Sequence, residues 1–187
     1  MPGSWPLTRN WHVDGVLSLS LAPAPDIDIL QPRATALART LAERLDYVGV
    51  FALELFVKDG GLLGNEMAPR VHNSGHWTIE GAHTSQFENH VRAVLGLPLG
   101  DTGARGLSAM FNWIGELPDP TPVLRTVDAH WHDYGKQARA GRKVGHARWP
   151  GPSRCQSRLR GHRRCGRNAR TRGCGHWKRL NRGASSR

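Results

Sequence analysis

The sequence changes character after His146, and this change separates a foldable part from an extension. The first 146 residues hold 13 Lys and Arg against 15 Asp and Glu, whereas the last 41 hold 13 Lys and Arg and no acidic residue. The formal net charge of +11 therefore comes entirely from residues 147–187. This segment is rich in Arg and Gly and has neither a helical nor a strand period, which is typical of a disordered tail. We expect the folded body to lie in residues 1–146.

The composition of this body indicates a reducing compartment, and we expect the protein to be cytoplasmic. All three cysteines, Cys155, Cys165 and Cys174, lie in the tail, which excludes a disulfide scaffold for the body. Together with His162 and His176 they lack the close paired spacing of a zinc site, so we do not expect a zinc finger. No apolar run reaches the roughly 20 residues of a membrane span, and the N-terminus lacks a signal-peptide pattern.

The hydrophobic pattern of the body predicts a mixed α/β (α+β) fold. Alternation of leucine and serine predicts a half-buried strand over residues 15–21, with the leucines on one face and the serines on the other. The run 47–57 is too apolar on both faces for a surface strand. Further strands are predicted over residues 62–67, 107–114 and 129–134, and another begins at Lys143.

Two amphipathic helices are predicted between the strands. Leucines four residues apart predict a helix over about residues 32–45, with Leu37, Leu41 and Leu45 on its inner face. Ser85 and Glu88 have the spacing of a capping box and predict a second helix over about 85–95. Its expected inner stripe consists of Phe87, Val91, Val94 and Leu95.

Two carboxylates lie on the predicted hairpin. Glu54 stands in the middle of its most apolar strand, where a charge is costly unless it is paired or bound to a metal. A two-residue turn would place Glu54 opposite Asn65, whereas a three-residue loop over residues 59–61 would place it opposite Glu66. We favour the three-residue loop, because Gly61 can take the left-handed position of a type I turn with a G1 bulge.

Two carboxylates that face each other across a ladder repel unless a cation lies between them. Oxygen ligands with open coordination positions suit Mg²⁺, which takes one or two carboxylates plus substrate phosphates. The alternative is that Glu54 pairs with an arginine such as Arg70, or lies at a solvated edge. On these residues alone the two interpretations are about equally supported.

Two later segments concentrate polar groups. The loop over residues 68–78 contains a cation, two imidazoles, an amide and a hydroxyl, and is well placed to hold an anionic substrate near the metal. The alternative is an ordinary polar loop whose Asn and Ser bond their own backbone. The segment 130–146 carries four cations that could bracket a phosphate, or it is simply a solvated basic hairpin.

Residues 65–78, 84–90 and 142–146 together resemble the N5-carboxyaminoimidazole ribonucleotide synthase family. These are ATP-grasp enzymes of purine biosynthesis, also described as the ATPase subunit of phosphoribosylaminoimidazole carboxylase. The resemblance covers about residues 5–146. It is specific, because other ATP-grasp carboxylating enzymes share the acid, the Asn-Glu pair and a following Pro-Arg, but not the string His-Asn-Ser-Gly-His-Trp-Thr.

This resemblance implies a ligase that uses ATP to carboxylate 5-aminoimidazole ribonucleotide with bicarbonate, giving N5-carboxyaminoimidazole ribonucleotide, ADP and phosphate. It implies that Glu54 and Glu66 hold Mg²⁺, or alternatively Mn²⁺, on the ATP phosphates. Asn65 would lie beside them at the nucleotide. The metal interpretation of the hairpin is therefore favoured for the intact enzyme.

The resemblance also implies two substrate sites. Bicarbonate and carboxyphosphate would be bound by catalytic residues that stabilise developing negative charge, namely Arg70, His72 and Asn73. The 5′-phosphate of the ribonucleotide would be bound by cationic side chains, namely Lys136, Arg142 and Lys143. Intact members of the family are expected to be homodimers.

The sequence begins near the middle of the family pattern, so we expect a fragment without turnover of its own. The predicted divisions are a C-terminal part of the ATP-grasp domain over residues 1–96, a small β-rich domain over 97–146, and the basic tail over 147–187. Residues typical of GC-rich codons make out-of-frame translation our favoured origin for the tail. The competing functions are a nucleic-acid-binding arm formed by its clustered arginines, or a remnant with no function.

Overall fold

The computed structural model describes residues 3–25 and 27–151 and confirms the mixed α/β class. The tail beyond residue 151, with its three cysteines and the nucleic-acid-binding alternative that rests on it, lies outside the described residues. No helix in the described ranges is long and apolar enough to span a membrane. The strands are β1 (Arg9–Val13), β2 (Val16–Ala22), β3 (Ala52–Lys58), β4 (Gly61–Ala68), β5 (Ser108–Ile114), β6 (His130–Asp133) and β7 (Lys143–Pro150). The helices are α1 (Gln31–Arg44), α2 (Thr78–Gly81), α3 (Gln86–Val94) and α4 (Thr121–Leu124), with 3₁₀ turns η1 (Asp28–Leu30) and η2 (Asn73–Gly75).

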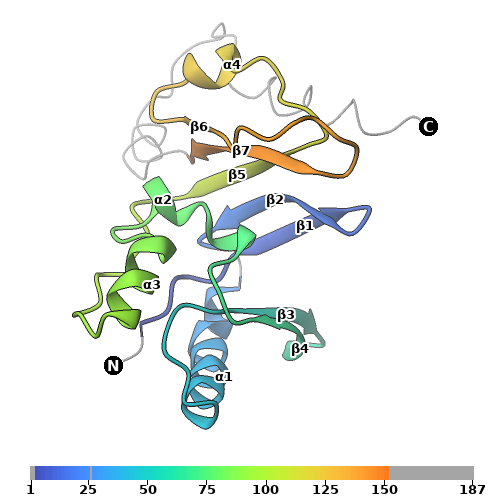
Figure 1. The fold of residues 1–187 in the computed structure, drawn as a ribbon. Helices are drawn as coiled ribbons and strands as arrows, with labels where there is room; N and C mark the ends of the chain where they lie inside the picture. The colour runs from blue at the N-terminus through green and yellow to red at the C-terminus, as the bar shows by residue number, and fades with distance from the viewer. Residues whose placement is uncertain (1–2, 26, 152–187) are drawn as a thin grey trace, which may run out of the picture. The chain divides into compact units, whose positions relative to one another are not determined.

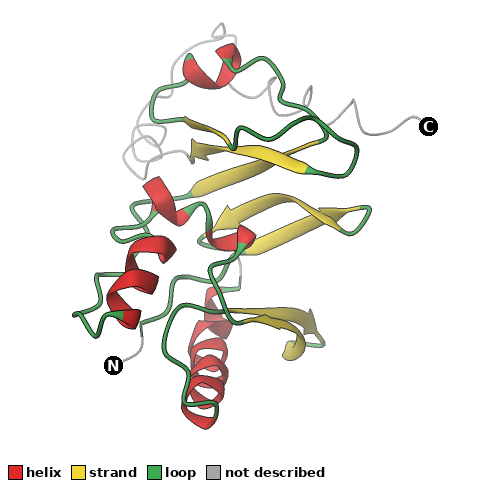
Figure 2. Cartoon of the chain, viewed as in Figure 1, coloured by secondary structure: helices red, strands yellow, loops and turns green. Residues whose placement is uncertain are grey.

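The strands form two antiparallel sheets (Figures 1 and 2). Five strands follow the order β1-β2-β5-β7-β6, and β3 and β4 form a separate hairpin. The larger sheet therefore combines β1 and β2, which precede residue 97, with β5, β6 and β7, which follow it. The sequence predicts a domain border at residue 97, and that border remains a prediction. Strand β7 continues to Pro150, with Ala147 and Arg148 buried. Regular structure thus extends beyond His146, where the sequence predicts the tail to begin.

The core lies where α2 meets the larger sheet. Trp77 is 1% exposed and packs with Met110 of β5, and its indole Nε1 donates to Thr8 Oγ1 at 3.1 Å. Strand β2 is confirmed, but its serine face does not point to solvent. Ser20 is buried and donates to Asn10 Oδ1, its direct partner on β1, at 2.7 Å, so the serine face of β2 is buried at this position.

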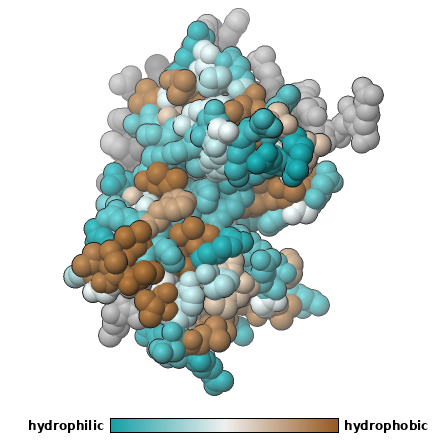
Figure 3. Space-filling model, viewed as in Figure 1, coloured by the Kyte–Doolittle hydropathy of each residue, from teal (hydrophilic) through white to brown (hydrophobic). Residues whose placement is uncertain are grey.

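Both predicted helices form within a residue or two of the expected bounds, but their predicted inner faces are mostly exposed, and of the residues assigned to them Leu41 alone is half-buried. In α1 only Ala34 is buried, and Leu37 and Leu45 are exposed. In α3 the buried residues are Gln86 and Asn89. The apolar stripe of α3 faces outward, where Figure 3 shows apolar side chains gathered near α3; its members are Phe87, Val91, Val94 and Leu95.

Polar partners explain which face of α3 lies inside. Asn89 Oδ1 accepts from the amide of Gly100 at 2.8 Å, and Asn89 Nδ2 donates to the Gly100 carbonyl at 3.2 Å. Gln86 is bound in the same way to the backbone of His72. A buried amide whose donors and acceptors are all used costs little, so two side chains with polar partners occupy the inner face.

The N-cap of α3 is confirmed and gives a first prediction. Ser85 Oγ accepts from the amide of Glu88 at 3.1 Å. We expect Ser85→Ala to lower the free energy of unfolding by about 1 kcal/mol, since one helix-terminal amide loses its acceptor. Urea denaturation followed by circular dichroism measures this effect. Ser18→Ala in β2, which removes a serine that caps no helix, is the matched control, and equal effects of the two variants would contradict the prediction.

Candidate active site

The β3–β4 hairpin brings Glu54 and Glu66 together by a different route from the one the sequence predicts. The turn has two residues, Asp59 and Gly60, both with positive φ, and Lys58 pairs with Gly61. This is the pattern of a type I′ turn, so the three-residue loop is wrong. A β-bulge between Glu54 and Leu55 then shifts the register by one residue, and the predicted pairing of Glu54 with Glu66 is confirmed.

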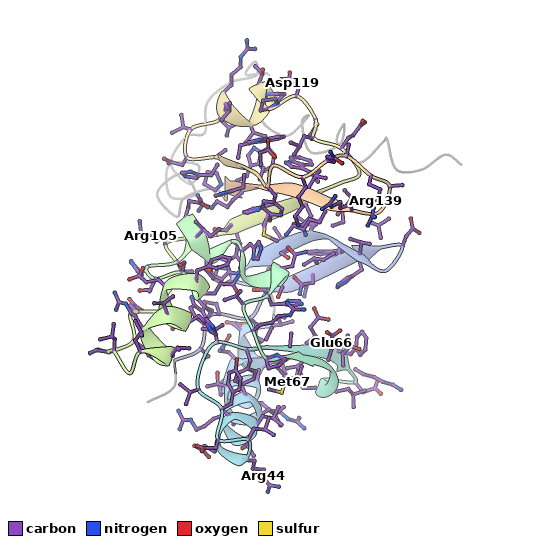
Figure 4. All side chains as sticks on the ribbon, viewed as in Figure 1. Arg44, Glu66, Met67, Arg105, Asp119 and Arg139 are labelled. Carbon is purple, nitrogen blue, oxygen red and sulfur yellow. The ribbon has the colours of Figure 1, made fainter. Side chains whose placement is uncertain are left out.

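The bulge leaves Asn65 as the extra residue on β4, because Leu55 pairs with Gly64 and Glu54 with Glu66. Direct cross-strand partners project from the same face of a ladder, so the two carboxylates share one side of the hairpin. Figure 4 shows Glu66 and Met67 on opposite sides of it. The hairpin is less buried than its apolar sequence predicts, since Phe56 and Val57 are 58% and 52% exposed.

Glu54 has polar neighbours but no arginine partner in the described part of the chain. Asn65 Nδ2 donates to Glu54 Oε2 at 3.3 Å, and His72 Nε2 lies 3.9 Å from Glu54 Oε1. Arg70 instead donates to the carbonyl of Val71 at 3.1 Å. The alternative in which Arg70 neutralises Glu54 is therefore wrong.

The loop that follows β4 is held by α3. Gln86 accepts from the amide of His72 at 2.9 Å and donates to its carbonyl at 2.8 Å. His72 Nδ1 accepts from the amide of Ser74 at 3.4 Å and lies 2.9 Å from its hydroxyl, and Nε2 faces Glu54. Burial is the largest influence on His72 and lowers its pKa, although Glu54 opposes this effect.

Asn73 links this loop to β7, because Lys143 Nζ donates to Asn73 Oδ1. Lys143 and Lys136 both lie near the ring of Tyr134, with Nζ to centroid distances of 5.2 and 5.3 Å. Burial, and secondarily the charge of Lys136, lower the pKa of Lys143 to about 7. The third predicted cation, Arg142, is fixed through its backbone to Arg139 and Gly115 and has no side-chain hydrogen bond to the described residues.

A row of three side chains in contact with one another, namely His146, His132 and Glu80, begins at the hydroxyl of Tyr134. Tyr134 OH is 2.7 Å from His146 Nδ1, and the His146 ring stacks on His132 with centroids 4.2 Å apart and an interplanar angle of 8°. His132 Nε2 lies 2.7 Å from Glu80 Oε1 on α2. Burial is the main reason that the pKa of His146 falls to about 2, which keeps this imidazole neutral.

A cavity of about 570 Å³ opens beside the hairpin. Its wall includes Glu54 and Asn65 from the hairpin, His72 from the following loop, and residues of α1. The Glu54 carboxylate, the Asn65 amide and the His72 imidazole thus line one concave surface, which is the usual setting of a ligand site, whereas Glu66 is exposed and lies outside the lining.

The donor set fits Mg²⁺ only in partnership with a ligand. Among the described residues no three His, Cys, Asp or Glu side chains are grouped to hold a metal ion by themselves. Two carboxylates on one face, beside an open cavity, match the small protein share of coordination that Mg²⁺ takes when phosphates supply the rest. Glu54 and Glu66 are the residues that would hold it.

Sequence reasoning missed several positioning residues. The role of Gln86 is not visible in the sequence, because its partner, the backbone of His72, lies 14 residues away. The only signal for it is a polar residue on the first turn of a helix. The stack of His132 on His146 follows from their pairing across β6 and β7, and only the register reveals it. Glu80 gave no signal in the sequence.

Comparison with known proteins points to one family. The ATP-grasp domain matches residues 2–87, and the phosphoribosylaminoimidazole carboxylase C-terminal domain matches residues 108–157. The N5-carboxyaminoimidazole ribonucleotide synthase of Pseudomonas aeruginosa is 56% identical over 143 residues, which cover 76% of this chain and 39% of that protein. The chain thus spans about two fifths of the length of the relatives that it matches.

Similar solved structures come from the same family. N5-carboxyaminoimidazole ribonucleotide synthetase from Thermus thermophilus superposes with a TM-score of 0.77 at 61% identity, covering 79% of this chain and 41% of its own. The synthase from Aspergillus clavatus, in complex with ADP and 5-aminoimidazole ribonucleotide, has a TM-score of 0.74 at 35% identity and covers 83% of this chain and 44% of its own.

Proposed function

The chain belongs to the N5-carboxyaminoimidazole ribonucleotide synthase family of ATP-grasp ligases, as a partial match, and on that premise we propose that it carries the metal, bicarbonate and ribonucleotide-phosphate residues of this reaction. The reaction joins bicarbonate to the amine of 5-aminoimidazole ribonucleotide and converts ATP to ADP and phosphate. The observation that supports the proposal best is the continuous line of contacts from Glu54 through His72 and Asn73 to Lys143.

The nucleotide end of this line is the hairpin. Glu54 and Glu66 are proposed to hold Mg²⁺, with Mn²⁺ as a substitute, and Asn65 to lie at the nucleotide. The metal would neutralise the phosphate charge of ATP. The hydrogen bond from Asn65 to Glu54 and the approach of His72 orient that carboxylate.

The middle of the line is the proposed bicarbonate site. Arg70, His72 and Asn73 would bind bicarbonate and the carboxyphosphate formed from it, and the arginine would stabilise the negative charge that develops on its oxygens. Gln86 fixes the backbone of this loop on both sides of His72. Pre-set donors of this kind lose little freedom when an anion binds.

The far end is the proposed phosphate site. Lys136, Arg142 and Lys143 are proposed to bind the 5′-phosphate of the ribonucleotide, and their positive charges match its negative charge. The contact between Lys143 and Asn73 connects this site to the bicarbonate loop. We further propose that the protein acts in the cytoplasm and that the intact enzyme is a homodimer.

Binding of 5-aminoimidazole ribonucleotide to the full chain tests the proposal. We expect isothermal titration to detect binding that Lys143→Gln weakens at least about tenfold, the usual effect of losing one charge-assisted contact. Lys58→Gln on β3 is the control, because Lys58 lies next to the hairpin turn. We expect no turnover by this chain alone, and release of phosphate that requires ATP, bicarbonate and the ribonucleotide would overturn that expectation. Failure to bind, or equal binding by the Lys143→Gln variant, would contradict the assignment.

A further inference from the structure

Tyr134, which follows the end of β6, is held in place by two contacts. Its amide donates to the carbonyl of Val144 at 3.0 Å, which joins the end of β6 to β7. Its hydroxyl lies 2.7 Å from His146 Nδ1. The ring is therefore anchored at both its backbone end and its hydroxyl end.

The anchor of the hydroxyl is itself held in place. His146 is 1% exposed, and its ring is stacked on His132, which is bonded to Glu80 of α2. Because burial keeps His146 neutral, its imidazole offers one donor and one acceptor and no charge. The neutral His146 ring therefore orients Tyr134 without adding a charge next to it.

Two ammonium groups lie near the fixed ring. Lys136 Nζ is 5.3 Å and Lys143 Nζ 5.2 Å from its centroid, within the range in which an aromatic face attracts a cation. Two like charges repel, and the lowered pKa of Lys143 shows the cost of bringing its ammonium group into this buried place beside Lys136. The negative face of the ring offsets part of that repulsion.

We propose that Tyr134 is a positioning residue of the phosphate site, whose ring face gathers the ammonium groups of Lys136 and Lys143 so that one phosphate can bind both. This rests on the proposed function for the phosphate, and adds to it a residue that touches no substrate atom. Without the ring, Lys136 would be free to turn into solvent and Lys143 would lose its proton more readily.

A pair of isosteric variants tests the contribution of the ring face. Tyr134→Phe keeps the ring and its negative face, whereas Tyr134→trifluorophenylalanine keeps nearly the same shape but withdraws electron density from the face. With ribose 5-phosphate as the probe and ribose as the uncharged control, we expect the first variant to bind within about threefold of wild type, and the second to bind about tenfold more weakly than the first.

A double-mutant cycle supplies a readout that a purely structural role would not change. Lys136→Gln should weaken binding of ribose 5-phosphate less in the trifluorophenylalanine background than in the Tyr134→Phe background, because the ring acts through the lysine. Thermal unfolding of each variant reports its folding.

The outcomes separate the two proposals. Equal binding by the two ring variants, with Lys143→Gln still deleterious, would overturn the role of Tyr134 and leave the phosphate site in place. Binding of ribose 5-phosphate that neither Lys136→Gln nor Lys143→Gln weakens, or no binding at all by the wild-type chain, would overturn the phosphate site and with it the inference.

Discussion

Glu54→Gln is expected to weaken binding of Mn²⁺ to the full chain in the presence of ADP by at least about 10- to 100-fold, the range found when even an outer-shell partner of a metal ligand is lost. Gln keeps the shape of the side chain and its bond with Asn65 but removes the anionic ligand. Without metal the same variant should be as stable as wild type or more so, because it removes the repulsion between directly opposed carboxylates. Electron paramagnetic resonance of Mn²⁺ measures binding, and thermal unfolding measures stability.

Glu66→Gln should behave in the same way, since the two residues are direct partners across the hairpin. Glu88→Gln is the matched control, because that carboxylate lies on α3 and is paired with Arg92 at 2.5 Å. Opposite changes in metal affinity and in stability would distinguish a ligand from a residue that merely supports the fold. Undiminished Mn²⁺ binding by both hairpin variants would contradict the metal assignment.

The hairpin shows how a correct prediction can rest on an incorrect step. The pairing of Glu54 with Glu66 was predicted from a three-residue loop, whereas the structure combines a two-residue turn with a bulge at Asn65. Both solutions shift the register by one residue. Turn residues are visible in a sequence, whereas a bulge depends on how the paired strands pack. Gly64 was a local sign of this one, since an isolated glycine in a strand often marks a bulge, but it does not fix the register.

Helix α3 shows the opposite case. Its bounds and its cap were predictable, because they depend on neighbouring residues and on local hydrogen bonds. Its inner face was not, since Gln86 and Asn89 are buried with partners at His72 and in the loop at Gly100. Periodicity identifies an apolar stripe, but it does not say whether another surface covers that stripe.

The residues of the candidate site also fall into those that the sequence identifies and those that only the structure identifies. Glu54 and Glu66 could be singled out from the cost of an acid in an apolar strand, and the roles of the other residues came from the family resemblance. The meeting of Lys136 and Lys143 at Tyr134 required the pairing of β6 with β7. Residues that act by positioning others, such as Gln86 and Tyr134, have no local pattern and emerge only from the contacts.

The fold should also lose stability steeply below neutral pH. Burial is the main reason that the pKa of His76 falls to about 4 and that of His146 to about 2, against about 6.5 in an unfolded chain. Between pH 6.5 and 4 the unfolded chain therefore binds more protons than the folded one, and stability is lost as the pH falls through this window. Two such histidines give a slope that approaches about 2.7 kcal/mol per pH unit.

Urea denaturation between pH 7.5 and 4.5 measures this slope. His146→Gln should lower the free energy of unfolding at pH 7, because Tyr134 loses its imidazole partner, yet it should reduce the slope by about one proton, or about 1.4 kcal/mol per pH unit. Ser18→Ala in β2, which removes no titratable group, should leave the slope unchanged. A variant that is less stable at pH 7 but less sensitive to acid cannot be explained by general weakening of the fold. An unchanged slope in His146→Gln would contradict the prediction, because it would mean that His146 is already protonated in the folded protein or that its burial is not maintained in solution.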